Sequence, residues 1–476
     1  MSGKAKRTGS NSVKAILDIG KTHIKLLFVK DGAEQASFSC KNAPIAGMYP
    51  QADVASIWAW LAETFRSYPH TASVTDLVFT THGATAALIN TDIADKANAL
   101  ALPVLDYEFT GVDACTAAYQ HVRPDFEQTL SPELPAGLNL GKQLFWLQQT
   151  YPEKFNAATH IVMYPQYWAW RFGGELASEV TSLGCHTDMW VPKSADYSSL
   201  VSQQNWRHLM PTMRNAWDCL GQVSAGVAEE TGLPVDCNIY AGVHDSNASF
   251  LRYLKSSQTG EGAFTVISTG TWTILMQGNG DVSALAGHQD TLANVDVKGN
   301  PVCCARFMGG REYESICTQL GGNISMTVEH SDVQQAIHEQ WLVTPDFSAG
   351  NGPYGGMTPS LCCPEAPKAP QAIATLYCAL MIDQRLNDLS ATGPIFIEGA
   401  FLKNPILCQI VAQLRPEQPV YLSADNTGTV MGAAALIDFE QTDALSFPLN
   451  PCKASEFAQL SQYKTAWYNE INKNQS

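Results

Sequence analysis

The first alternation of apolar and polar positions predicts two strands joined by a polar turn. Residues 15–17 are apolar, residues 18–22 read Asp-Ile-Gly-Lys-Thr, and residues 24–29 are again largely apolar. Asp31-Gly32 follows, and Asp-Gly between extended runs is typical of a β-hairpin. We therefore expect an antiparallel meander whose first turn carries an aspartate and a glycine.

A similar pattern returns in the second half of the chain. Apolar residues 264–267 lead into Ser-Thr-Gly-Thr at 268–271, and apolar residues resume at 273–276. When the segments are superposed, Gly20 falls on Gly270. The repetition indicates two related halves. The alternative is a pair of unrelated hairpins that both need a glycine.

Two further segments predict buried strands that end at polar residues. Residues 76–81 lead to His82-Gly83, and residues 238–241 lead to Gly-Val-His-Asp at 242–245. In α/β sheets, ligands collect at the carboxyl ends of strands. We therefore expect both ends to lie at a ligand site.

The last third of the chain predicts two more strands and a helix. The strand at 394–397 stops at Glu-Gly-Ala-Phe-Leu-Lys-Asn-Pro, residues 398–405. The strand at 420–422 is followed by Asp-Asn-Thr-Gly at 425–428 and by a helix of small residues through 432–435. Small residues permit this helix to pack closely against a sheet or a ligand.

The length of 476 residues exceeds what one hydrophobic core usually supports. Apolar positions with helical spacing occur at 140–149 and 373–380 and predict ordinary core helices. We expect a flexible tail at 1–12, a first domain at 13–255 and a second at 256–476.

Composition narrows the class of protein. Hydrophobic residues make up 45% and charged residues 16%, as in globular proteins. The net charge of −16 disfavours nucleic acid and anionic membranes as main partners. The sequence has no run of about 18 apolar residues and no segment resembling a secretory signal. The 13 cysteines are therefore expected to be reduced thiols of a cytoplasmic protein.

Two glycine-containing turns offer backbone N–H donors to phosphate. The first also offers the Asp18 carboxylate to Mg²⁺, usually through water, and the second offers hydroxyl groups. Neither has the spacing of a Walker A loop. Together the turns could clamp a triphosphate, and the residues expected to contact it are Gly20, Lys21, Thr22, Thr269, Gly270 and Thr271.

Asp245 is the candidate general base, because an aspartate at a strand end beside a metal can accept the proton of an attacking hydroxyl. Its alternative role is that of a helix N-cap, since Ser-Asn-Ala-Ser follows. His82 could bind a sugar hydroxyl or simply close its strand. Asp106 and Glu108 could accept hydrogen bonds from polyol hydroxyls or could belong to a solvated loop.

Five segments, taken in their order along the chain, resemble motifs of the FGGY carbohydrate kinases, a family with an actin-like fold. The resemblance covers nearly the whole chain. Its segments are residues 17–22, 81–85, 241–248, 268–271 and 398–405.

The resemblance implies an α/β protein of two ribonuclease-H-like domains around a central cleft, the first binding the sugar and the second most of the ATP. It implies Asp245 as the base and Asp18 and Asp245 beside Mg²⁺. It also suggests a homodimer. The implied sugar contacts are His82, Gly83, Asp106, Glu108, His244 and Asp245, and the further nucleotide contacts are Gly309, Gly310, Gly399, Ala400, Lys403 and Asn404.

The sequence departs from the family pattern at three places. Many members have a hydroxyl residue where Lys21 stands, a second glycine where Ala400 stands, and a segment with tryptophan and arginine near residues 106–108. Lys21 could contact the β- or γ-phosphate or form an ion pair with Asp18. We expect an ATP-dependent kinase of a pentulose, hexulose or deoxyketose; the alternative is a non-catalytic sensor of sugar and nucleotide with the same fold.

Overall fold

The computed structural model divides the chain into two compact units. It describes residues 12–256, 258–325, 327–348, 352–364, 367–423, 428–441 and 445–475. Unit one takes the described residues of Met1–Lys255, Asn294–Asn300 and Thr427–Leu445, and unit two those of Ser256–Ala293, Pro301–Asn426 and Ser446–Ser476. The expected tail, apart from Ser12, and the expected loop at 425–427 lie outside the described residues.

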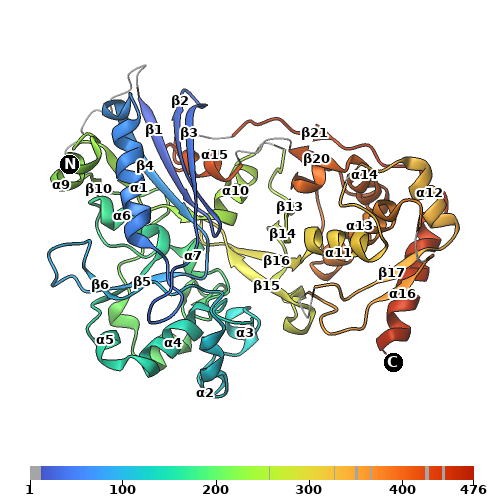
Figure 1. Ribbon diagram of the computed structural model, residues 1–476, viewed down its shortest axis with the longest axis horizontal. Coiled ribbons are helices and arrows are strands. Elements are labelled where there is room, and N and C mark those ends of the chain that lie inside the picture. The colour runs from blue at the N-terminus through green and yellow to red at the C-terminus, as the bar shows by residue number, and fades with distance from the viewer. Residues whose placement is uncertain are drawn as a thin grey trace. The chain divides into compact units, whose positions relative to one another are not determined.

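Unit one is built on a mixed sheet in the order β10-β11-β4-β1-β2-β3, with β12 also paired to β4. Figure 1 labels β1, β2, β3, β4 and β10 of this sheet. β1, β2 and β3 are antiparallel to one another, whereas β4 runs parallel to β1, β11 and β12. The strands are β1 (Val13–Ile19), β2 (His23–Lys30), β3 (Ala33–Lys41), β4 (Val74–Thr81), β10 (Cys219–Gln222), β11 (Asn238–Tyr240) and β12 (Val243–His244).

The predicted meander is confirmed. Asp31 and Gly32 join β2 to β3 with positive φ angles of 52° and 76°, as a tight hairpin turn between twisted strands requires.

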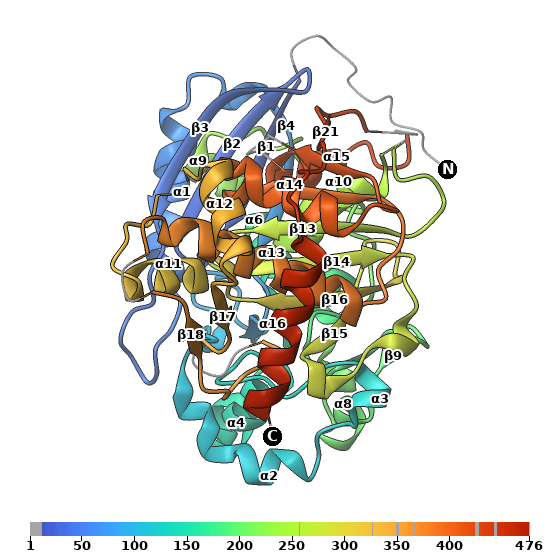
Figure 2. The same ribbon diagram turned by 90° about the vertical axis from the view of Figure 1, so that its right-hand side faces the viewer.

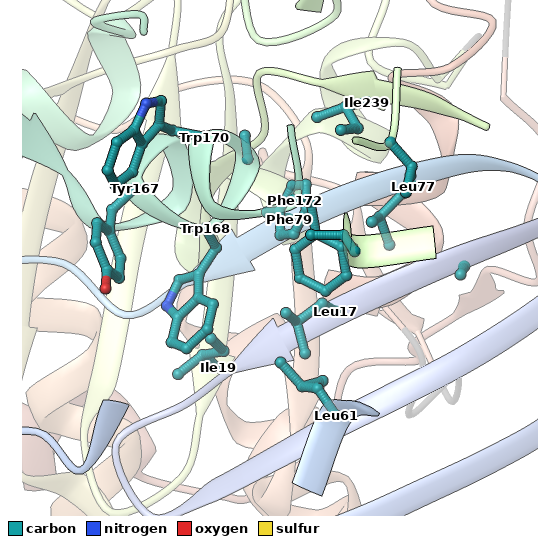
Figure 3. Packing of buried hydrophobic residues seen from close by; sticks show 14 of the residues in the cluster. Leu17, Ile19, Leu61, Leu77, Phe79, Tyr167, Trp168, Trp170, Phe172 and Ile239 are labelled. Atoms are coloured by element: carbon teal, nitrogen blue, oxygen red, sulfur yellow. The ribbon is translucent and has the colours of Figure 1, made fainter. Parts of the chain in front are cut away.

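Helices cover both faces of this sheet, because successive side chains of each strand point to opposite faces. Leu17 and Phe28 belong to a core shared with α1 (Val54–Ser67) and α6 (Tyr164–Phe172), part of which Figure 3 shows. Ile16 and its neighbours pack instead against α10 (Asp245–Leu254) and α15 (Gly428–Ala435).

The small residues of α15 allow close packing against the sheet strands β1 and β4, as expected from the sequence, and also against the helix α10. A Cβ atom on Gly432 would lie 1.7 Å from the carbonyl oxygen of Ala248 in α10. Only glycine therefore permits this approach of the two helices.

The rest of unit one has its own core around a small sheet of β5 (Ala86–Ile89), β6 (Leu100–Leu102) and β7 (His160–Met163). The predicted helix at 140–149 is α4 (Leu140–Thr150), whose leucines are buried in this core. The shorter elements are α2 (Thr116–Gln120), α3 (Phe126–Thr129), α5 (Pro152–Asn156), α7 (Val180–Leu183), β8 (Trp190–Val191), β9 (Asp196–Tyr197), α8 (Ser199–Gln203) and α9 (Ala225–Thr231).

Unit two is built on a sheet in the order β15-β16-β14-β13-β19-β20-β21. β13 and β14 form an antiparallel hairpin, and β13 runs parallel to β19, as β1 does to β4. The strands are β13 (Phe264–Thr269), β14 (Thr273–Gly278), β15 (Thr291–Val295), β16 (Pro301–Phe307), β19 (Ile395–Gly399), β20 (Val420–Ser423) and β21 (Asn450–Pro451).

This shared strand order supports two related halves, with one difference in the turns. The Gly20 N–H donates to the His23 carbonyl at 2.9 Å, whereas the Gly270 N–H donates to the Trp272 carbonyl at 2.9 Å. The second turn is therefore one residue shorter than the first.

Helices also accompany the sheet of unit two, as Figure 2 shows. The predicted helix at 373–380 lies within α13 (Pro370–Asp388), which packs against α11 (Gly309–Gln319) and α14 (Pro405–Leu414). No helix among the described residues is long and apolar enough to cross a membrane. The remaining elements are α11 (Gly309–Gln319), α12 (His330–His338), β17 (Leu342–Thr344), β18 (Ser360–Cys362), α13 (Pro370–Asp388), α14 (Pro405–Leu414) and α16 (Leu460–Gln475).

Candidate active site

Three parallel strands of unit one end at the same edge of its sheet. Ile19 of β1 pairs with Thr81 of β4, and Thr81 pairs with His244 of β12. The residues around these ends include Asp18, His82 and Asp245. The strand ends named from the sequence therefore do meet, because parallel strands bring their carboxyl ends to one edge.

The side-chain carboxylate of Asp18 accepts no hydrogen bond from the described residues. Burial, together with the negative charge of Asp245, raises the pKa of Asp18 to about 7, although Lys25 across the hairpin on β2 acts against this shift. Two carboxylates in a desolvated setting form a donor set that suits a hard divalent cation. Asp18 and Asp245 thus fit Mg²⁺ held partly through water. The described residues include no cluster of three or more His, Cys, Asp or Glu that would hold a metal alone.

Asp245 is the first residue of α10, and the N-cap position belongs to His244. The alternative interpretation of Asp245 as the N-cap is therefore wrong. Its Oδ1 atom accepts a hydrogen bond from the Ser246 N–H at 2.6 Å, and its side chain is 32% exposed. Its Oδ2 atom has no partner among the described residues. One carboxylate oxygen thus remains open to a ligand.

His244 is buried between Asp245 and Cys185. Its Nε2 atom lies 3.2 Å from Oδ1 of Asp245 and 3.8 Å from Sγ of Cys185. Burial alone would lower the pKa of His244, but the negative charges of Cys185 and Asp245 outweigh it and raise the pKa. Burial acts to raise the pKa of the Cys185 thiol, yet His186 and His244 lower it.

Two neighbouring features hold His244 in place. Its backbone N–H donates to Oγ1 of Thr181 at 3.0 Å, and that hydroxyl donates to Oε2 of the buried Glu179 at 2.6 Å. A Cβ atom on Gly83 would lie 2.8 Å from Nε2 of His244. Gly83 therefore leaves room for the imidazole, which gives this residue a role in shaping the site.

His82 is positioned by its backbone and by two aromatic rings. Its N–H donates to the Ile19 carbonyl at 2.9 Å, and its ring centroid lies 5.4 Å from those of Tyr107 and Tyr164. Burial lowers the pKa of His82, so the imidazole is neutral at neutral pH. Nδ1 lies 3.1 Å from the Gly83 carbonyl, while Nε2 has no partner among the described residues. That nitrogen is available to a polar ligand.

Lys21 lies against residues 106–108. Its ammonium forms an ion pair with Asp106 and another with Glu108, whose Oε2 atom is 3.3 Å away. It also lies 4.6 Å from the ring centroid of Tyr107. An ion pair with Asp18 is therefore not formed. A phosphate contact by Lys21 stays a prediction, and so do those of Gly20 and the exposed Thr22.

The second turn is held at the edge of the unit-two sheet. Thr269 donates through Oγ1 to the Glu398 carbonyl at 2.6 Å and accepts from the Phe401 N–H at 2.9 Å. The Gly310 N–H at the start of α11 donates to the Gly270 carbonyl at 3.1 Å. Residues 269–271, 309–310 and 399–401 therefore form one connected group.

Glycine is required at three points of this group. A Cβ atom on Gly310 would lie 2.3 Å from the Gly270 carbonyl oxygen, and one on Gly309 would lie 2.3 Å from Oγ1 of Thr273. Gly399 has φ 90° and ψ −148°, a conformation that essentially only glycine adopts. These glycines therefore permit the close approach of the protein's own segments within this group.

The remaining predicted nucleotide contacts follow β19. Ala400 and Lys403 bound a short 3₁₀ turn, and Lys403 is exposed. Asn404 caps α14: Oδ1 accepts from the Leu407 N–H at 3.2 Å, and Nδ2 donates to Oγ1 of Thr375 at 2.8 Å. Its side chain is thus engaged within the protein. Nucleotide contacts by these residues stay predictions.

Sequence reasoning did not identify Glu179, Thr181 or Cys185. They lie in a short polar stretch around α7, and the buried cysteine is 59 residues from His244 in the chain. The available signal was the string of polar residues between 178 and 188, in which no spacing indicates a contact with His244.

Comparisons with known proteins agree with this architecture. The N-terminal domain of the FGGY family of carbohydrate kinases matches residues 13–251, and the carbohydrate kinase FGGY C-terminal domain matches residues 261–445. Comparison with curated proteins gives no match.

Solved structures resemble the whole chain. A carbohydrate kinase from Novosphingobium aromaticivorans is 32% identical, with a TM-score of 0.87 over 97% of this chain and 99% of the other. A xylulose kinase from Lactobacillus acidophilus is 14% identical, with a TM-score of 0.78 over 97% and 98%. A Plasmodium falciparum glycerol kinase with ADP is 12% identical, with a TM-score of 0.75 over the same shares.

Two α/β units with matching strand order define a protein of the actin-like ATPase fold class. The chain belongs to the FGGY family of carbohydrate kinases. It is therefore an enzyme that transfers a phosphoryl group to an alcohol group of a sugar, and the kinase family implies ATP as the donor.

Proposed function

We propose that this kinase transfers the γ-phosphoryl group of ATP to a hydroxyl of a neutral ketose of five or six carbons, a deoxyketose included. The observation that carries the proposal is the meeting of Asp18, His82 and Asp245 at one edge of the unit-one sheet. We assign the sugar to residues of unit one, namely His82, Gly83, Asp106, Glu108, His244 and Asp245. We assign the nucleotide to the glycine-rich turns.

In the proposed reaction the sugar oxygen bonds to the γ-phosphorus, and the bond from that phosphorus to the leaving ADP oxygen breaks. Oδ2 of Asp245 accepts the hydroxyl proton, while His244 and the Ser246 N–H hold Oδ1. An aspartate suffices as base because phosphoryl transfer depends mostly on positioning and charge neutralisation. Mg²⁺, when bound with ATP, supplies neutralisation of the phosphate charge.

The charges of the site favour a neutral acceptor. Asp18, Asp106, Glu108 and Asp245 contribute carboxylates to this part of unit one, against the ammonium groups of Lys21, which pairs with Asp106 and Glu108, and of Lys25. A sugar acid would place another negative charge among them, and like charges at short range disfavour binding. Solved xylulose and gluconate kinases share the fold at 14% identity, so the fold alone does not select between the two classes.

The test is MgATP consumption against a panel of xylulose, ribulose, rhamnulose, fuculose, glycerol and gluconate. We expect a neutral ketose to give the highest kcat/KM and gluconate to give little turnover. Asp245→Ala should abolish the sugar-dependent rate, whereas Asp92→Ala, which alters an exposed aspartate of the same unit, should leave it unchanged. If no sugar supports turnover but ATP and a sugar each raise the melting temperature, the protein is a sensor rather than a kinase.

A further inference from the structure

Three consecutive residues surround the Lys21 ammonium. Asp106 and Glu108 bind it through their carboxylates, and the Tyr107 ring lies 4.6 Å from it. The Lys21 side chain is 21% exposed and that of Asp106 is 6% exposed, so the ion pair with Asp106 is shielded from solvent. Removing one partner of such a pair strongly destabilises the protein, because the other partner is left as an unpaired buried charge.

Each end of this contact is anchored separately. The turn that carries Lys21 is held by Asn42, whose Nδ2 donates to the Gly20 carbonyl at 2.8 Å and whose N–H donates to the Thr22 carbonyl at 2.8 Å. At the other end, the Asp106 N–H donates to the Pro50 carbonyl at 3.0 Å. Lys21 therefore links two segments that would otherwise be held independently.

The linked segment faces the sugar side of the site. The Tyr107 ring lies 5.4 Å from the ring of His82. Oδ1 of Asp106 is occupied by Lys21 and by the Glu108 N–H at 2.8 Å, while Oδ2 has no partner among the described residues. Moving residues 106–108 would therefore move an available acceptor and the aromatic neighbour of His82 together.

We propose that Lys21 is a positioning residue for the sugar, which fixes Asp106 and Tyr107 and so sets the affinity for the acceptor rather than for the nucleotide. The inference rests on the proposed function. The ammonium is already compensated by two carboxylates, so it presents little net charge to a phosphate. The departures from the family pattern at Lys21 and at residues 106–108 are also explained, since Lys21 pairs with the two carboxylates of that segment.

Steady-state rates of Lys21→Met with the sugar and MgATP varied in turn test this proposal. Methionine keeps the apolar stem and removes the charge. We expect the KM for the sugar to rise about tenfold or more while the KM for MgATP changes by less than about twofold. Lys21→Arg should restore part of the sugar affinity. Lys41→Met, which removes an exposed charge from β3 of the same meander, should match the wild type in both KM values.

A double variant separates positioning from general damage. Because Lys21 is argued to act through Asp106, Lys21→Met combined with Asp106→Asn should raise the sugar KM no more than the larger single effect. A rise confined to the KM for MgATP, an equal rise in both KM values, or a loss confined to kcat overturns the proposal. If Lys21→Met does not fold, the same comparison is made with Lys21→Arg. A wild type that phosphorylates no sugar overturns the proposed function instead.

Discussion

The Nε2 atom of His244 lies 3.2 Å from Oδ1 of Asp245, and the imidazole has little room to move. Asn247 contacts its Nδ1 atom at 3.3 Å, Sγ of Cys185 lies 3.8 Å from the same Nε2 atom, and a side chain on Gly83 would meet that atom at 2.8 Å. Asp245 therefore has a fixed orientation before any ligand binds. This arrangement and the glycine-containing turns have consequences that can be measured.

Gly83→Ala should lower turnover strongly while the protein stays folded. The new methyl group would lie 2.8 Å from Nε2 of His244, and the buried ring can yield only by moving against Asp245 or Cys185. Overpacking of this kind costs about 1–3 kcal/mol. We expect kcat to fall about tenfold or more, because a misplacement of about 1 Å in a catalytic constellation can cost about a hundredfold.

Gly226→Ala is the matched control for this change. A Cβ atom there meets nothing within 4 Å, and the residue lies inside α9. Alanine should leave kcat unchanged and raise the melting temperature slightly, since glycine within a helix is about 0.5–1 kcal/mol less favourable than alanine. Equal kcat values for the two variants would contradict the role given to Gly83.

Gly399→Ala should weaken nucleotide binding and destabilise unit two. Its Cβ atom would lie 2.1 Å from the Thr269 carbonyl oxygen, and the φ angle of 90° adds backbone strain. Isothermal titration with ATP measures the effect, which we expect to exceed a tenfold loss of affinity. At Gly262, where an added Cβ meets nothing within 4 Å, alanine should bind ATP normally. Unaltered ATP affinity in Gly399→Ala would remove this segment from the nucleotide site.

Asp18→Asn should make the ligand-free protein more stable and the enzyme inactive. Burial and Asp245 raise the pKa of Asp18 to about 7, so the stability that the protonated carboxyl provides is lost as the pH rises through that value. At pH 8, the neutral amide should raise the melting temperature in the absence of MgATP. MgATP should then stabilise the wild type more than the variant. A lower melting temperature for the ligand-free variant at pH 8 would contradict the raised pKa of this carboxyl group.

Glu312→Gln should alter the pH dependence of stability through unit two. Burial raises the pKa of Glu312 to about 7 even though the Tyr377 hydroxyl donates to its carboxylate. The stability that the protonated Glu312 carboxyl contributes is fully present below about pH 4.5 and is lost as the pH rises through about 7. The melting temperature of the variant minus that of the wild type should therefore be larger at pH 8 than at pH 5.

The comparison variant for this prediction is Glu314→Gln on the same helix. Glu314 is exposed, so its replacement should give the same difference from the wild type at pH 5 and pH 8. If both variants behave alike, burial of Glu312 does not govern the pH response.

Local sequence patterns predicted much of the fold. Asp31-Gly32 predicted a hairpin, and the segments before His82 and before His244 predicted buried strands that end at polar residues. Parallel pairing then placed those ends at one edge without further information. The one-residue difference between the turns at Gly20 and Gly270 was not predictable, because hairpin register depends on the turn that forms.

The sequence predicted less of the environment around the reacting groups. Cys185 contacts His244 only because tertiary packing brings the two segments together. Lys21 pairs with Asp106, and not with its chain neighbour Asp18, because of the fold of residues 106–108. Such contacts join segments far apart in the chain, and no periodicity encodes them. Residue type indicated which groups could act, whereas burial and charge decided how they interact.

The central claim, that Asp245 is the base of a sugar kinase, is tested most directly with Asp245→Asn and the preferred sugar of the wild type. The amide keeps the shape of the side chain but accepts a proton poorly. We expect that the sugar still raises the melting temperature of the variant while kcat falls by about a hundredfold to ten-thousandfold. Sugar-dependent ATP consumption at the wild-type rate would contradict it.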